Sequence, residues 1–128
     1  MVQNTLARVV MGGQRHDNIT LILRDLHWLP VSKRIEFKVA TLTFKVKSTG
    51  QPEYLSSLLN DYAPTRTLRS AQLQTLIVPR TRTVLAERRF SVAAPTIWNS
   101  IPLDIRQSLT VQSFKHHLKT YYFKSVFI

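Results

Sequence analysis

Apolar residues recur at intervals of three and four along most of this 128-residue chain. Because an α-helix has 3.6 residues per turn, this spacing places them on one face of a helix. The pattern predicts helices over residues 18–27, 33–47, 53–59 and 111–124, the end of another helix over 5–10, and a helical turn at 103–108. Gly12-Gly13, Pro30 and Gly50 separate the first of these segments.

Polar residues and prolines in front of the helices predict where they begin. Asp17, Ser32 and Thr110 are expected to cap the helices that follow them, and Pro52 suits the first position of the helix after it. The stripe expected to face the core in the 33–47 helix is Ile35, Val39, Leu42 and Val46, widened by Phe37, Ala40 and Phe44. In the last helix Val111, Phe114, Leu118 and Tyr121 or Tyr122 are expected to point inward.

The helical period fails between residues 61 and 70, which we interpret as a loop. Residues 73–78 and 81–85 then read as two short strands around Pro79-Arg80. The expected fold is therefore mostly α, with about five short helices and a small β-hairpin near 73–85. Length alone favours one domain over residues 1–128.

The stretch FSVAAPTIWNSIP, residues 90–102, carries no charge and holds one of the chain's two tryptophans. Ser91 could cap a helix that begins at Val92, or Pro95 could be the first residue of the helix. Phe90, Ile97, Trp98 and Ile101 are spaced to share one helical face. Uncharged segments rich in large apolar residues are usually buried, and a buried Asn99 would then need backbone partners. The favoured interpretation is a core latch; the alternative is an exposed Trp98 that stacks on a nucleic-acid base.

The composition is strongly basic, with 18 Lys and Arg, 7 Asp and Glu, and a formal net charge of +11. This balance favours a polyanionic partner, RNA or DNA first. There is no cysteine, no long apolar run and no pattern of a signal peptide, so we expect no membrane segment and an intracellular location, in the nucleus or cytoplasm.

Arginine is concentrated between residues 66 and 89, where Glu87 is the single acidic residue. Guanidinium groups bind phosphate in a bidentate manner and stack on bases. The predicted nucleic-acid contacts are Arg66, Arg69, Arg80, Arg82, Arg88 and Arg89, with Arg80 and Arg82 on one face of a strand. A second candidate face consists of Lys33, Arg34, Lys38 and Lys45. A merely solvated basic surface is the alternative for either set.

The sequence contains few residues in patterns that are typical of enzymes. The seven carboxylates are widely spaced, and no phosphate-binding loop, nucleophile elbow or dinucleotide fingerprint is present. His116 and His117 are adjacent, so a helix would point them about 100° apart. We expect no catalytic residue, no metal site and no cofactor.

Several motifs together resemble one family. They are VQNTLARVV (2–10), LHWLPVSKRIEFKVATLTFKV (26–46), PEYLSSLLNDYAPTRTLRS (52–70), VPRTRT (78–83), RRFSVAAPTIWNSIPLDIR (88–106) and SFKHHLKTYYF (113–123). Their order and spacing are similar to the C-terminal tail of the open reading frame of LINE-type (non-LTR) retrotransposons, the region that follows the reverse-transcriptase domain. The polymerase signature and the endonuclease of that family have no counterpart here.

The resemblance implies a non-catalytic accessory tail of a reverse transcriptase that binds template RNA or target DNA. The chain is expected to be a truncated fragment of such a polyprotein, and the polymerase portion of the parent is a second expected partner. Two alternatives remain open at this point: a structural buttress without activity of its own, and a host interaction module.

Overall fold

The computed structural model describes residues 2–14, 17–62 and 75–128. Within these ranges the chain forms eight α-helices and no strand, which confirms the mostly α prediction. The helices are α1 (Val2–Met11), α2 (Ile19–Asp25), α3 (Val31–Thr49), α4 (Glu53–Ser56), α5 (Val84–Glu87), α6 (Phe90–Ser100), α7 (Leu103–Arg106) and α8 (Val111–Phe127).

Helix starts agree with the predicted caps in part. Thr110 caps α8 as expected, because its hydroxyl accepts the Ser113 N–H at 3.1 Å. Asn18, and not Asp17, caps α2, while the Asp17 carboxylate accepts the N–H of Gln14 instead. Helix α3 begins directly after Pro30, so Ser32 already lies inside it and the predicted Ser32 cap is wrong.

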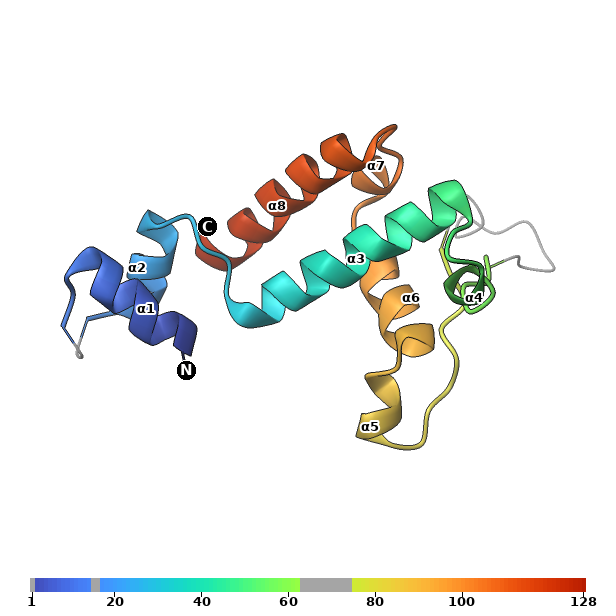
Figure 1. Ribbon diagram of the computed structural model, residues 1–128, viewed down its shortest axis with the longest axis horizontal. Coiled ribbons are helices and arrows are strands. Elements are labelled where there is room, and N and C mark those ends of the chain that lie inside the picture. The colour runs from blue at the N-terminus through green and yellow to red at the C-terminus, as the bar shows by residue number, and fades with distance from the viewer. Residues whose placement is uncertain (1, 15–16, 63–74) are drawn as a thin grey trace.

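Helix α3 is the central element, and both α6 and α8 pack against it. Figure 1 shows α8 running back along α3, with α6 crossing below and the α1–α2 pair at the far end. Phe44 joins the three long helices, since its ring centroid lies 6.5 Å from that of Trp98 and 4.5 Å from that of Phe114. Trp98 and Phe114 are themselves 5.8 Å apart. The main core therefore sits where α3, α6 and α8 meet.

The buried face of α3 differs from the predicted stripe. Ile35 and Leu42 are exposed, so they are wrongly placed in it, whereas Ala40, Phe44 and Val46 are buried as predicted. The hydroxyl-bearing Thr43, which the prediction left out, is also buried. Because α3 is covered by helices on two sides, its buried surface is wider than one periodic stripe and is set by its neighbours. The Thr43 hydroxyl is satisfied inside the helix by the carbonyl oxygen of Val39, at 2.8 Å.

Residues 90–102 form the latch that their composition predicts. They make up α6 and the residues just after it, and Trp98 is only 3% exposed. The alternative of an exposed Trp98 stacking on a base is therefore wrong. Pro95 is fully buried within α6 and is not its first residue, since the helix begins at Phe90.

The predicted β-hairpin is wrong for residues 75–85, while residues 73 and 74 lie outside the described ranges. Leu76 pairs with Asp61 in an isolated antiparallel bridge, and no second strand follows. The Thr83 hydroxyl accepts the N–H of Ala86 at 3.1 Å, which starts α5 where a strand was expected.

The Asn99 side chain, on α6, hydrogen-bonds the backbone of Leu76 in this bridge. In the bridge, backbone hydrogen bonds run from Tyr62 to Thr75 and from Ile77 to Asn60, so the polar groups of Leu76 point away from Asp61. The Asn99 side chain accepts the Leu76 N–H and donates to the Leu76 carbonyl, each at 2.8 Å. Asn99 is half-buried, and its amide has the backbone partners that were expected.

A smaller apolar cluster holds α1 to α2. Ala7, Ile22 and Leu23 are its buried residues, and Trp28 and Phe127 pack against it. Phe127 belongs to α8, so this cluster also attaches the N-terminal helix pair to the end of the main core.

Replacing Asn99 by Ala removes both partners of the buried Leu76 backbone. We expect the free energy of unfolding to fall by about 2–4 kcal/mol, since an orphaned buried donor or acceptor costs about 1–3 kcal/mol. Urea unfolding followed by circular dichroism measures this. Ser100→Ala, on the exposed side of the same helix, is the matched control and should change stability by less than about 0.5 kcal/mol. Equal effects of the two substitutions would contradict the role assigned to Asn99.

Tyr122 is buried in the main core, and its hydroxyl has no hydrogen-bond partner among the residues that the structure describes. Burial raises the pKa of Tyr122 well above its usual range, and the negative charge of Glu36 raises it further. The neutral phenol is therefore the form that the folded chain accommodates.

A raised folded-state pKa makes stability fall at alkaline pH. The contribution of the neutral Tyr122 to the free energy of unfolding is fully present below the pKa of an unfolded tyrosine, about 10. It is lost as the pH rises above that value. Tyr122→Phe should leave stability at pH 7 unchanged or raise it by about 1 kcal/mol, because a partnerless hydroxyl leaves the core. It should also flatten the alkaline decline in thermal unfolding temperature. Tyr121→Phe serves as the neighbouring control, and an unflattened profile in Tyr122→Phe would refute this account.

Candidate nucleic-acid interface

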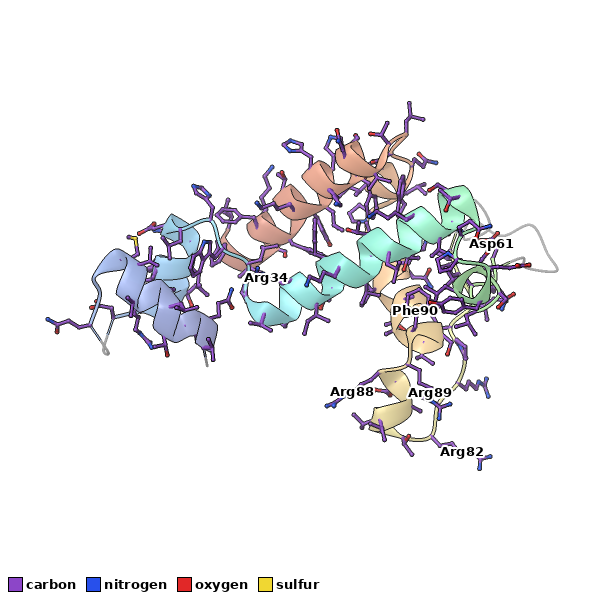
Figure 2. The ribbon with its side chains drawn as sticks, viewed as in Figure 1. Arg34, Asp61, Arg82, Arg88, Arg89 and Phe90 are labelled. Atoms are coloured by element: carbon purple, nitrogen blue, oxygen red, sulfur yellow. The ribbon has the colours of Figure 1, made fainter. Side chains whose placement is uncertain are left out.

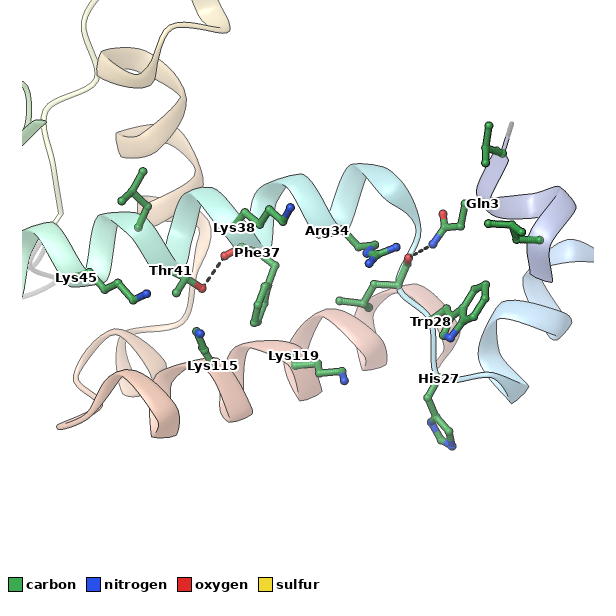
Figure 3. Close-up of a pocket in the computed structure, with 14 residues that line it drawn as sticks. Gln3, His27, Trp28, Arg34, Phe37, Lys38, Thr41, Lys45, Lys115 and Lys119 are labelled. Carbon is green, nitrogen blue, oxygen red and sulfur yellow. Dashed lines mark hydrogen bonds between the residues drawn. The ribbon is translucent and has the colours of Figure 1, made fainter. Parts of the chain in front are cut away.

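An open groove of about 970 Å³ lies between α3, α8 and α1. We call it the α3–α8 groove; Figure 3 shows the side chains that line it. Two helices form its long walls, and residues 27–29, which connect α2 to α3, lie at one end. At that end the Gln3 side chain donates to the carbonyl oxygen of Leu29 at 2.6 Å, which ties α1 to this connection.

Five cationic side chains line the groove and no carboxylate does. They are Arg34, Lys38 and Lys45 from α3, and Lys115 and Lys119 from α8. The ion pairs found among the described residues are Arg24–Asp25, Lys33–Glu36 and Lys47–Asp61, so none of the five takes part in one. The groove is thus a concentration of positive charge that no acidic side chain of the described chain neutralises.

Helical periodicity explains the order of the cations on the α3 wall. Arg34, Lys38 and Lys45 are four and seven residues apart, which keeps them on one side of the helix. At a rise of 1.5 Å per residue, the row extends over roughly 16 Å of helix axis. Lys115 and Lys119 are four apart on α8 and supply the facing wall in the same way.

The groove also has an apolar and aromatic part. Trp28 and Phe37 line it and are half-buried. His27 lies at the same end, with a positive φ of 56°, and its ring stacks on Phe123 of α8 at 5.3 Å. Trp28 lies at this end of the groove as well, in the connection between α2 and α3 (Figure 3).

The second predicted face, Lys33, Arg34, Lys38 and Lys45, is brought together by the structure with one exception. Lys33 points elsewhere: its ammonium lies 3.2 Å from the Glu36 carboxylate and 5.3 Å from the centre of the Tyr122 ring. The remaining three residues lie on the groove.

The arginine set predicted for phosphate contacts is distributed differently. Arg66 and Arg69 lie outside the described residues. Arg80, Arg82, Arg88 and Arg89 are all exposed, on the segment that precedes α5 and on the α5–α6 junction. Figure 2 shows Arg88 and Arg82 on different sides of α5, far from Arg34 on α3. We call residues 79–89 the arginine arm.

The expected alternation of Arg80 and Arg82 on a strand face is wrong, because residues 80–83 form a loop that ends in the Thr83 cap. The four described arginines of the arm form no ion pair with a described carboxylate. They remain an exposed, charged surface.

Sequence reasoning missed Lys115, Lys119 and Trp28. The signal for the two lysines was present, since each directly follows one of the inward residues Phe114 and Leu118 and therefore flanks the buried side of α8. Their convergence with Arg34 and Lys38 required the antiparallel packing of α8 on α3, which the sequence does not encode locally.

No group of three or more His, Asp or Glu side chains with metal-binding geometry occurs within the described ranges. In the same ranges no helix combines the length and apolar character needed to cross a membrane. Comparison with protein-family models, with curated proteins and with solved structures finds no match to this chain.

Proposed function

We propose that this chain is a non-catalytic module that binds nucleic acid through the α3–α8 groove. The observation that carries the proposal is the lining of the groove, with five cations from two helices and no carboxylate. Such clustering of one sign focuses the electrostatic potential on a concave surface and attracts a polyanion.

The extent of the cationic row favours a polymer over a small anion. A single phosphate or carboxylate is held by a compact set of converging donors. Here the α3 cations are spread over roughly 16 Å and are faced by two more on α8, which suits a series of backbone phosphates. The net charge of +11 adds long-range attraction for the same class of partner.

The sequence resemblance to the tail of LINE-type retrotransposon polyproteins supports the same assignment. As part of this proposal, the chain is an accessory tail that holds RNA or DNA, in the nucleus or cytoplasm, and leaves polymerisation to the parent protein. The arginine arm would add phosphate contacts outside the groove.

The test is binding to labelled single-stranded RNA and to duplex DNA over a salt series, followed by fluorescence anisotropy. Lys38→Ala/Lys119→Ala removes one cation from each wall of the groove. We expect weaker binding and, on single strands, a slope of log K against log salt reduced by about 1.4, since each phosphate contact contributes about 0.7.

Arg82→Ala/Arg88→Ala is the matched control, because it removes the same charge from the arginine arm. A loss of slope in this variant, with none in the groove variant, would move the interface to the arm. Absence of binding by the wild-type chain at low salt would reject the proposed function itself.

A specific observation also favours a structural role as a second candidate. Val2, Leu6, Val9 and Val10 repeat at helical spacing on α1 and are all exposed, Val9 to 72%. Contiguous apolar surface of this kind commonly marks a protein interface.

In this second role α1 docks on the polymerase portion of the parent protein. Val9→Glu/Val10→Glu should then abolish co-purification with a separately expressed polymerase portion and leave RNA affinity unchanged, since neither residue lines the groove. Lys38→Ala/Lys119→Ala should show the reverse pattern. Unimpaired co-purification of the valine variant would dismiss the docking role.

A further inference from the structure

Trp28 has two different surroundings. It packs against the apolar cluster of α1 and α2, and it also lines the α3–α8 groove. It is half-buried, so part of the indole remains open to the groove. The other tryptophan, Trp98, is enclosed in the main core at 3% exposure. Trp28 is therefore the tryptophan available to a ligand.

The surface between the two cationic walls is largely apolar. Leu29, Phe37 and Leu42 line the groove together with Trp28. The Thr41 hydroxyl also lines the groove, and it donates a hydrogen bond to the carbonyl oxygen of Phe37 at 2.8 Å (Figure 3). The groove thus offers cations along its sides and aromatic and aliphatic carbon between them.

This arrangement distinguishes two forms of nucleic acid. A duplex presents phosphates on its outside and keeps the faces of its bases stacked inside, so it would leave Trp28 and Phe37 without a partner. A single strand presents phosphates and unstacked base faces together.

We propose that the α3–α8 groove selects single-stranded nucleic acid, with one base stacked on Trp28 and the flanking phosphates held by Arg34 and Lys38 on one wall and Lys119 on the other. This inference rests on the proposed function and specifies its substrate class. Base stacking on an aromatic ring tolerates any sequence, since every base has a π face.

The position of Arg34 supports the assignment of Trp28 as the stacking ring. Arg34 lies in the first turn of α3 and Trp28 in the segment just before that helix, and both residues line the groove. A base on Trp28 would place its own phosphate within the cationic row that begins at Arg34. Phe37, three residues further along α3, offers apolar contact to a neighbouring base.

The first experiment compares two short single-stranded DNA probes of equal length, one with bases and one with abasic sites throughout. Both carry the same phosphates, so only stacking distinguishes them. We expect the wild-type chain to bind the abasic probe roughly 5- to 150-fold more weakly, the range for loss of one stacked base. A duplex of equal length should bind more weakly than the base-containing strand at the same salt.

The second experiment uses two variants at Trp28. Trp28→Leu keeps an apolar side chain against α1 and α2 but removes the ring, and should lower affinity for the base-containing strand by the same factor with an unchanged salt slope. Trp28→Phe keeps a ring and should restore most of that affinity. Lys38→Ala/Lys119→Ala should instead change the salt slope, which separates stacking from phosphate contacts.

Intrinsic tryptophan fluorescence separates the two roles, because its intensity would not change on binding if Trp28 were only structural. Binding of the base-containing strand should quench the wild-type emission, and the quench should be absent in Trp28→Phe, whose remaining tryptophan is buried. Equal binding of base-containing and abasic strands, or quenching that persists in Trp28→Phe, overturns the stacking inference and leaves the proposed function standing. Failure of every probe to bind rejects both.

Discussion

The aromatic contact of Phe44 with Trp98 and Phe114 is the interaction on which the rest of the structure depends. It joins α3 to α6 on one side and to α8 on the other, and stacked or tilted aromatic pairs add about 0.5–1.5 kcal/mol each beyond the area they bury. Since α3 and α8 are also the walls of the groove, this contact sets how its two rows of cations face each other. The charge concentration at the surface is thus a consequence of packing in the core.

Hydrogen bonds from polar side chains fix the segments that connect to α6. The amide of Asn99 satisfies both backbone groups of Leu76 and so attaches the bridge between residues 60–62 and 75–77 to α6. Arg106, also buried, donates from Nε to the carbonyl oxygen of Ile101 at 3.0 Å and holds the turn after α6, although burial lowers the pKa of Arg106. Apolar contacts bring the helices together, while these hydrogen bonds determine how the connecting segments leave them.

The distribution of charge relates the two candidate surfaces. In the groove, cations from α3 and α8 converge on a concave and partly aromatic surface. On the arginine arm, the described arginines are exposed and diverge around α5 (Figure 2). Converging charge with an apolar floor favours a defined binding mode, whereas diverging exposed arginines favour weak contacts with any nearby phosphate. Under the proposed function, one nucleic acid would bind in the groove and make weaker contacts with the arm.

The sequence by itself determined the helices other than α5, the Thr110 cap, the inward side of α8 and the burial of Trp98 within residues 90–102, because periodicity, capping chemistry and uncharged composition act over a few neighbouring residues. It also located Arg34, Lys38 and Lys45 on one helix face. Only the tertiary structure decided that Lys115 and Lys119 face them, that Trp28 ends the same groove, and that Leu76 pairs with Asp61 and Asn99 in place of a hairpin. These features arise from contacts between residues that are far apart in the chain. The stability of such contacts depends on which surfaces pack together, and the local sequence pattern does not specify this.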